Sequence, residues 1–220
     1  MPIQRHRINY DKLTSDQIAA WLEIPPAIVS DMMNRTQVMD GRIKPVKEGM
    51  RVCGQARTVT AMVGDNGAVH MAIGLCEPGE ILVVDAGGFL GTAIWGGIMT
   101  RAALQRGVGG LVVDGAVRDV AEIREMGFNT FSAGIVPAGP HKGFGGVIDG
   151  VIACAGCPVK SGDIVIGDDD GVAVVPLERQ ETLLAASLEK LAQEEATNAQ
   201  TADGKLPGDR LGLPEPEWLD

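Results

Sequence analysis

An arginine and an aspartate stand side by side just after an apolar run, and this pair is the most chemically suggestive feature of the sequence. Arg118 and Asp119 close the segment DGAVRD, residues 114–119, which follows LVV at 111–113. A guanidinium is a planar fork that suits a carboxylate or a polarised carbonyl. A carboxylate supplies a hard oxygen for Mg²⁺ or Mn²⁺, which keep several waters and need few protein ligands. The pair therefore suits a small 2-oxo acid that chelates a divalent metal, and the alternative is a surface ion pair or a helix N-cap by Asp119.

The second feature is a glycine-rich segment, residues 86–97, which ends in Gly96 and Gly97. These two glycines precede a predicted helix that begins at Ile98, and the free amides of a helix N-terminus form an anion site. The order of the glycines matches neither a dinucleotide fingerprint nor a nucleotide triphosphate loop. Close packing of a helix on a strand explains the glycines equally well, and it is the nearby Arg118 and Asp119 that favour a carboxylate site.

The elements around these two loops alternate between strand and helix. This succession predicts a parallel βαβ unit, in which ligands bind beyond the carboxyl ends of the strands. Both loops follow a strand, so we expect them at the same edge of the sheet. The predicted elements are strand 81–85, the glycine loop, helix 98–106, strand 110–114, the loop with Arg118, and helix 120–126.

Hydrophobic periodicity and turn residues predict the remaining elements. We expect one α/β domain over residues 1–220, with an extended tail at 198–220 that is frayed or packs on a neighbouring subunit. The further elements are helices 16–22, 27–33, 68–75 and 177–197, strands 52–62, 130–131 and 146–153, and a hairpin of 164–166 with 172–175.

Composition excludes several classes of function. The chain has 220 residues, 45% of them hydrophobic, and a formal net charge of -10. Nucleic-acid binding needs a basic face, so we expect no nucleic-acid partner. We find no apolar run long enough for a membrane span and no signal-peptide segment, which predicts a cytoplasmic protein with no membrane partner.

Two short motifs resemble metal sites. The four cysteines include a C-x-x-C motif at Cys154 and Cys157. The second cysteine pair that a zinc ribbon needs is missing from the sequence. Reduced thiols with a structural role are therefore favoured over a redox or metal role. The three aspartates at 168–170 are followed by Gly171 between two apolar runs. A tight turn selects these residues, whereas a calcium loop needs alternating ligands, so a hairpin turn is favoured.

Residues 95–99 (WGGIM) and 114–119 (DGAVRD) together resemble one protein family. It contains the class II 4-hydroxy-4-methyl-2-oxoglutarate and 4-carboxy-4-hydroxy-2-oxoadipate aldolases and the regulator of ribonuclease E activity, RraA. The resemblance runs from about residue 26 to 176 and includes the segments 64–66 (GDN), 162–165 (GDIV) and 168–172 (DDDGV). It implies a swivelling β/β/α sandwich with a parallel βαβ core and flanking helices, assembled as a homotrimer or homohexamer with sites near subunit contacts.

The resemblance also implies roles for individual residues. Asp119 would be the direct ligand of Mg²⁺ or Mn²⁺, and Arg118 would contact the substrate carboxylate and its 2-oxo oxygen. Backbone amides would bind the pyruvyl carboxylate, and the residues that carry them are Gly96, Gly97, Ile98 and Met99.

This chain departs from the aldolase pattern at one position. The aldolases carry an acidic residue that holds metal-bound water in the second place of the glycine pair, where this chain has Gly97. Loss of such an outer group typically lowers affinity or activity ~10 to 100-fold. Asp85, or Glu194 or Glu195 of a neighbouring subunit, are candidates to replace it, although a strand-end cap and solvated helix charges explain these residues more simply. His70 is expected to be a helix residue near the site rather than a ligand.

The leading hypothesis is a divalent-metal-dependent lyase that releases pyruvate from 4-hydroxy-2-oxo diacids, with oxaloacetate decarboxylation as a further activity. Arg118 would help to carry the charge of the pyruvate enolate, and Asp119 would hold the metal. Neither loop contains a lysine, which disfavours a Schiff-base aldolase, but Lys142 keeps that mechanism open. The alternative is a non-catalytic RraA-type regulator that binds ribonuclease E or another protein through its acidic surface.

Overall fold

The computed structural model describes residues 2–219 and is built around a ten-stranded mixed sheet. Four parallel strands form its centre, and they lie side by side in the order in which they occur in the chain. Parallel neighbours require crossover connections, which the intervening helices supply. The central strands are β3 (Val52–Ala61), β4 (Ile81–Asp85), β6 (Gly110–Val117) and β7 (Thr130–Ile135).

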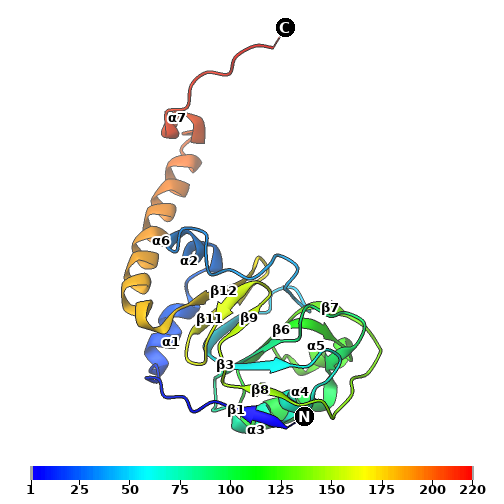
Figure 1. The fold of residues 1–220 in the computed structure, drawn as a ribbon. Helices are drawn as coiled ribbons and strands as arrows, with labels where there is room; N and C mark the ends of the chain where they lie inside the picture. Colours follow the sequence, from blue (N-terminus) through cyan, green and yellow to red (C-terminus); the bar gives the residue numbers. More distant parts are fainter. Residues whose placement is uncertain (1, 220) are drawn as a thin grey trace.

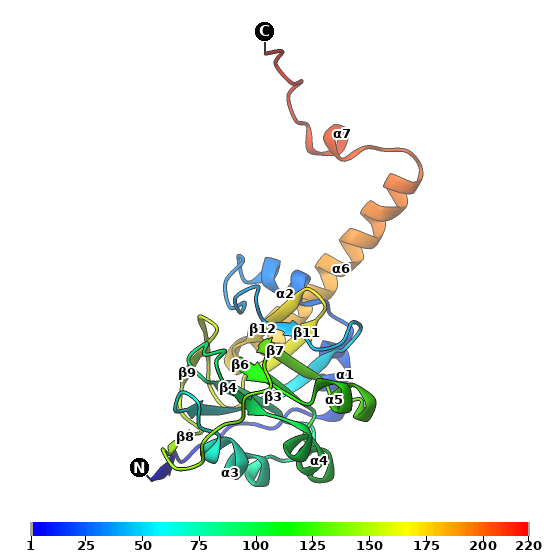
Figure 2. The ribbon, with the colours of Figure 1, turned by 90° about the vertical axis from the view of Figure 1, so that its right-hand side faces the viewer.

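Three helices cover one side of the parallel strands, and β-hairpins lie on the other (Figure 2). The helices are α3 (Gly67–Leu75), α4 (Gly97–Arg106) and α5 (Val120–Met126). The hairpins pair β9 (Ile152–Cys154) with β10 (Cys157–Val159), and β11 (Ile164–Asp168) with β12 (Gly171–Val175). The mixed α/β fold predicted from the sequence is thus confirmed.

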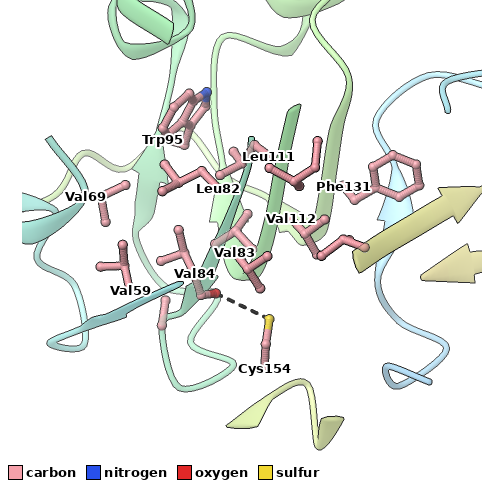
Figure 3. Close-up of a cluster of buried hydrophobic side chains, with 14 of the residues drawn as sticks. Val59, Val69, Leu82, Val83, Val84, Trp95, Leu111, Val112, Phe131 and Cys154 are labelled. Atoms are coloured by element: carbon pink, nitrogen blue, oxygen red, sulfur yellow. Dashed lines mark hydrogen bonds between the residues drawn. The ribbon is translucent and has the colours of Figure 1, made fainter. Parts of the chain in front are cut away.

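The core lies on both faces of the central strands, which explains their uninterrupted apolar sequences. Figure 3 shows Val83, Val84 and Val112 among the side chains of this cluster, and none of the three is exposed to solvent. The Cys154 thiol donates to the carbonyl of Val84 at 3.6 Å, and this hydrogen bond connects the β9–β10 hairpin to the sheet. The same cluster includes Trp95, at the edge where α4 begins.

A second apolar cluster packs the terminal helices on the β11–β12 hairpin. Helix α1 (Ser15–Leu22) begins at a capping box, in which Thr14 and Gln17 each satisfy a backbone amide of the other. Helices α2 (Pro26–Met32) and α6 (Gln180–Ala202) complete this layer, but α6 then projects beyond the body (Figure 1). Among residues 2–219, no helix combines the length and the hydropathy that crossing a bilayer would require.

Short strands and helical turns make up the rest of the structure. The strands extend the sheet, and the two short helical elements lie before and after helix α6 in the chain. These elements are β1 (Ile3–Arg5), β2 (Lys44–Pro45), β5 (Ala93–Trp95), β8 (Gly146–Ile148), the 3-10 turn η1 (Leu177–Arg179) and α7 (Pro207–Leu211).

Several element predictions are corrected by the structure. Strand β7 continues to Ile135, whereas the sequence predicted a strand only over 130–131. Strand β6 runs to Val117 instead of 114, because the unexpected strand β5 pairs with its end. The predicted strand 146–153 is split into β8 and β9 by Asp149, whose φ of 64° breaks the extended chain. Helix α6 continues to Ala202 rather than 197, and the tail contains the short helix α7.

Both motifs that resemble metal sites are turns. Ala155 and Gly156 adopt positive φ angles between β9 and β10, and burial raises the pKa of the Cys157 thiol to about 12. In the β11–β12 hairpin, the Asp168 carboxylate accepts from the amide of Asp170 at 2.9 Å. The predicted hairpin turn at the aspartates is therefore confirmed, and the structural role of the two cysteines stays a prediction.

A buried ionic network holds the N-terminal segment against the amino-terminal edge of the sheet. The Arg57 guanidinium donates to Glu80 at 2.8 Å and to Asp149 at 2.9 Å, and all three residues are buried. Tyr10 and Lys12 add hydrogen bonds to Glu80 from the chain before α1. Burial alone would raise the pKa of Glu80, but these donors outweigh it and lower the pKa to about 2.

We predict that Glu80→Gln removes an acid-dependent part of the stability. A carboxyl whose pKa is depressed on folding stabilises the protein above its unfolded pKa, and this contribution disappears as the pH falls through the folded value. The wild type should therefore exceed Glu80→Gln by roughly 3 kcal/mol near pH 6. The difference should shrink steadily below about pH 4.5 in urea titrations of the unfolding free energy.

The matched control is Glu77→Gln, at a largely exposed side chain whose nearest cation is Lys12 at 3.5 Å. This change should alter the free energy of unfolding by less than ~0.5 kcal/mol. A deficit of Glu80→Gln that stays constant from pH 6 to pH 3 would contradict the assignment.

Candidate functional site

A cavity of about 200 Å³ lies near the carboxyl end of β6, where α4 and α5 begin. Five of the six site residues predicted from the sequence line it. The sixth, Gly97, is the first residue of α4 and stands in the chain between the lining residues Gly96 and Ile98. The lining consists of Asn66, His70, Ala93, Ile94, Trp95, Gly96, Ile98, Met99, Arg118, Asp119, Pro140 and Lys142.

The start of α4 is held in place by its two preceding residues. The Trp95 indole donates to the Thr100 hydroxyl at 2.8 Å and stacks on Phe128 with ring centroids 6.0 Å apart. Gly96 is needed because a Cβ there would lie 2.6 Å from Asp119 Oδ2 and 3.1 Å from Arg118 Cγ. The absence of a side chain at Gly96 thus allows the two candidate loops to touch.

Asp119 faces the start of α4 instead of capping its own helix. It is the residue before α5, its φ of 56° is left-handed, and its side chain makes no capping bond to α5. Such a conformation is uncommon for a residue with a Cβ and needs support from its surroundings. Oδ2 accepts from the Gly97 amide at 3.0 Å. The other oxygen, Oδ1, receives no hydrogen bond from residues 2–219 and is available to a ligand.

The Gly97 hydrogen bond refines the predicted anion site. The first amides of an α-helix have no partner within the helix. Gly97 gives its amide to Asp119, so the amides of Ile98 and Met99 are those left to bind a substrate carboxylate at this helix start. Gly96, Ile98 and Met99 line the same cavity as Arg118. The substrate-binding role of these residues and of Gly97 stays a prediction.

Arg118 directly follows the end of β6 and lines the cavity. Its amide donates to the carbonyl of Trp95 at 2.9 Å, which fixes the backbone beside β5. The guanidinium Nε lies 3.7 Å from Asp119 Oδ2, a loose ion pair whose partners are both about two-fifths exposed. No hydrogen bond from this guanidinium to another side chain or backbone group is formed within residues 2–219, so most of its donors are available to an anionic ligand.

Asn66 lines the cavity, although no role for it was predicted from the sequence. It is 3% exposed, and its Nδ2 donates to the carbonyl of Ile94 at 3.0 Å and to Met99 Sδ at 3.3 Å. Its Oδ1 is buried without a hydrogen-bond partner among the described residues. A buried unpaired acceptor is costly unless a ligand or water satisfies it. The only available signal was the GDN segment, which carries no chemistry by itself.

Lys142 reaches the cavity from a third loop that the sequence did not connect with the other two. Asp65 is buried and accepts from the amides of Gly143 at 2.6 Å and Phe144 at 3.2 Å, which holds this loop over the site. Burial raises the pKa of Asp65, but these amides and that of Gly67 outweigh it, so the net shift is downward. Lys142 itself is exposed.

His70 lies on α3 and lines the cavity, as expected. Its pKa is lowered, first by partial burial and then by the positive charge of Lys142. Both causes disfavour the imidazolium. A neutral imidazole at this position can accept a proton near neutral pH.

The side chains present fit a hard, largely hydrated cation better than zinc. Within residues 2–219 no group of three or more His, Cys, Asp or Glu side chains could enclose an ion. Asp119 offers one free carboxylate oxygen, and Mg²⁺ or Mn²⁺ needs only one or two carboxylates beside water and substrate.

The three proposed replacements for an acidic residue at position 97 do not lie in this cavity. Asp85 Oδ1 accepts from the amide of Gly87 at 2.9 Å and belongs to a local turn. Glu194 pairs with Lys190 at 3.3 Å on α6, and Glu195 is on the same helix. None of them is therefore part of the site within one chain.

Comparison with known proteins identifies the family. The family model described as RraA-like, Aldolase/RraA, matches residues 26–174. The chain belongs to the RraA-like family. A Halalkalibacterium halodurans protein with the provisional name 4-hydroxy-4-methyl-2-oxoglutarate aldolase is 36% identical, over 87% of this chain and 91% of its own length.

Relatives in this family carry both aldolase and regulator names. A Thermus thermophilus protein named 4-hydroxy-4-methyl-2-oxoglutarate aldolase is 31% identical over 67% of this chain and 90% of its own length. A Streptomyces coelicolor structure, described as an unusual member of the RNase ES inhibitor RraA family, superposes with a TM-score of 0.79. It is 25% identical, over 86% of this chain and 99% of its own.

We predict that Lys142→Gln raises the pKa of His70, because it removes the nearby positive charge that disfavours the imidazolium. Proton and carbon NMR titration of the imidazole signals measures the change, and His70→Asn identifies the His70 signal. Lys160→Gln is the matched control, since Lys160 pairs with Glu178 at 2.9 Å and does not line the cavity. An unchanged or lower pKa of His70 in Lys142→Gln would contradict the prediction.

Proposed function

We propose that this protein is a divalent-metal-dependent lyase that cleaves 4-hydroxy-2-oxo diacids and releases pyruvate. The substrates would be 4-hydroxy-4-methyl-2-oxoglutarate or 4-carboxy-4-hydroxy-2-oxoadipate, with oxaloacetate decarboxylation as a further activity. The observation that carries this proposal is the convergence of Arg118, Asp119 and the first free amides of α4 on one small cavity. The aldolase names of relatives support it.

In the proposed reaction the cavity binds the 2-oxo acid end of the substrate. The amides of Ile98 and Met99 hold its carboxylate at the positive end of α4. The Arg118 guanidinium donates to the 2-oxo oxygen and carries the charge that develops there. Asn66 Oδ1 accepts a hydroxyl proton of the substrate in a hydrogen bond, which satisfies its buried lone pairs.

Cleavage breaks the C3–C4 bond of the substrate. A base takes the C4 hydroxyl proton, the C4 oxygen forms a carbonyl, and the C3–C4 bond electrons move into the pyruvate enolate, which is then protonated at C3. His70 is the proposed proton acceptor, because its lowered pKa keeps the imidazole neutral near neutral pH. A Mg²⁺ or Mn²⁺ ion held by Asp119 would supply Lewis acidity at the 2-oxo group.

Lys142 makes a Schiff-base mechanism a specific rival, because the structure brings it to the cavity. A lysine nucleophile is usually activated by removal from water or by a second cation. Lys142 is exposed, so the metal-dependent mechanism is favoured. Borohydride added during turnover should leave the protein unmodified, and a trapped pyruvyl adduct on Lys142 would reverse this choice.

The second candidate function is a non-catalytic regulator that binds ribonuclease E or another protein. The inhibitor description of the Streptomyces coelicolor relative favours it, as does the net charge of -10, which suits a basic partner. Such a role does not require a free carboxylate oxygen beside an open helix start.

The proposal includes a homo-oligomer, trimeric or hexameric. Helix α6 and the tail project away from the body (Figure 1). The side chains of Leu211, Leu213 and Trp218 in and after α7 are exposed. Apolar side chains on such an extension are expected to be covered by a neighbouring subunit. Light scattering should therefore give a multiple of the chain mass, and a monomer at micromolar concentration would contradict this assembly.

We predict that Asp119→Asn lowers pyruvate release from oxaloacetate with Mn²⁺ by at least about 100-fold, because the amide is a poor ligand for a hard cation. Calorimetry should show the parallel loss of Mn²⁺ binding. Lactate dehydrogenase and NADH report the pyruvate formed.

Asp209→Asn is the matched control, since this aspartate is exposed on α7 and away from the cavity. It should retain wild-type activity and Mn²⁺ affinity. Equal rates for the wild type and Asp119→Asn, or no pyruvate from the wild type with either diacid or oxaloacetate, would favour the regulator.

A further inference from the structure

The space beside Gly97 is filled by the side chain of another helix. A Cβ placed on Gly97 would collide with the carboxylate of Glu122, which reaches across from the first turn of α5. Residue 97 lies inside α4 with an ordinary helical φ, so the backbone does not require glycine there. The Glu122 carboxylate instead occupies the space that a side chain at position 97 would need, and it would have to move to admit one.

The two oxygens of the Glu122 carboxylate have different surroundings. Oε1 accepts from the guanidinium of Arg101, which lies one turn after Gly97 on the same face of α4. Oε2 is the atom nearest to the Gly97 backbone. Among residues 2–219, no donor forms a hydrogen bond with Oε2. Arg101 therefore holds the carboxylate over Gly97 with one oxygen free.

Glu122 and Asp119 converge on the same residue from one turn of α5. Asp119 Oδ2 accepts the Gly97 amide, while Glu122 Oε2 lies against the position of the missing side chain. A Glu three residues after a helix N-cap often turns back to cap that helix. Here the left-handed backbone of Asp119 and the pair with Arg101 direct it towards α4 instead.

A salt bridge between α4 and α5 explains the contact with Arg101, but it leaves Oε2 without a hydrogen-bond partner among residues 2–219. Arg101 offsets the charge of Glu122, but Asp119 is paired only loosely with Arg118, at 3.7 Å. The buried, unpaired Oδ1 of Asn66 independently indicates that the neighbouring cavity takes a ligand with donor groups. The charge and the acceptors together suit a hydrated cation.

We propose that Glu122 is a positioning residue of this site. Its carboxylate supplies, from α5, the negative charge that a side chain at position 97 would supply from α4, and Oε2 accepts from water that hydrates the cation held by Asp119. This inference rests on the proposed function, because it requires that cation. Glu122 therefore raises the affinity for a divalent ion without touching the substrate.

The experiment measures Mn²⁺ affinity by calorimetry and bound water by proton relaxation, so that it does not depend on turnover. Glu122→Gln keeps the shape of the side chain and removes its charge, and it should weaken Mn²⁺ binding about 10-fold or more. Glu125→Gln is the matched control, because this exposed glutamate lies on the same helix and makes no contact with Gly97. Glu125→Gln should bind Mn²⁺ as the wild type does.

A relocation of the charge tests the geometry directly. Gly97→Asp alone places two carboxylates in one space and should impair Mn²⁺ binding or lower the melting temperature. Glu122→Ala alone should weaken Mn²⁺ binding, and combining it with Gly97→Asp should restore the affinity to within about 3-fold of wild type, since an outer group is worth ~10 to 100-fold. A natively folded double variant that binds no better than Glu122→Ala would overturn the proposal.

The outcomes separate the two proposals. If the wild type binds Mn²⁺ and releases pyruvate, while Glu122→Gln binds Mn²⁺ equally well, Glu122 is only a salt-bridge residue and the proposed function stands. If the wild type itself binds no Mn²⁺, both proposals are overturned.

Discussion

The contact between the Asp119 carboxylate and the start of α4 is the constraint on which the site depends. Two loops that follow different strands meet there, and the Gly97 amide joins them at 3.0 Å. The approach is possible only because Gly96 has no side chain, since a Cβ would lie 2.6 Å from the carboxylate. A carboxylate at a helix N-terminus is electrostatically favourable, which helps to support the left-handed backbone of Asp119.

The two ends of the parallel strands differ in how completely their charged side chains are paired. At the amino-terminal edge, Arg57, Glu80 and Asp149 form a buried network in which the charges are paired with one another. Such a network contributes to stability and leaves little capacity for a ligand. At the opposite edge, Arg118 and Asp119 are loosely paired and partly exposed. Incomplete pairing costs stability there and leaves the donors and acceptors that a substrate needs.

The sequence predicted the elements and the central pair of the site, but not the contacts that complete it. Strand β4 and helices α4 and α5 were recognisable from apolar runs and periodicity, which depend on local sequence. Strand β5 is three residues long and exists because β6 pairs with it, so no local signal marked it. Asn66 and Lys142 likewise reach the cavity through tertiary contacts, the first by its bond to Ile94 and the second through the loop that Asp65 holds.

The net charge of -10 makes the local arrangement of charge decisive for an anionic ligand. Solvent ions screen charges beyond about 8 Å at physiological ionic strength, so the distant acidic surface contributes little inside the cavity. Within that range lie Arg118, Lys142 and the positive end of α4, opposed by Asp119. These groups already sum to a net positive charge, and a divalent cation on Asp119 would increase it further. Anion binding and metal binding are therefore expected to be coupled, with each strengthening the other.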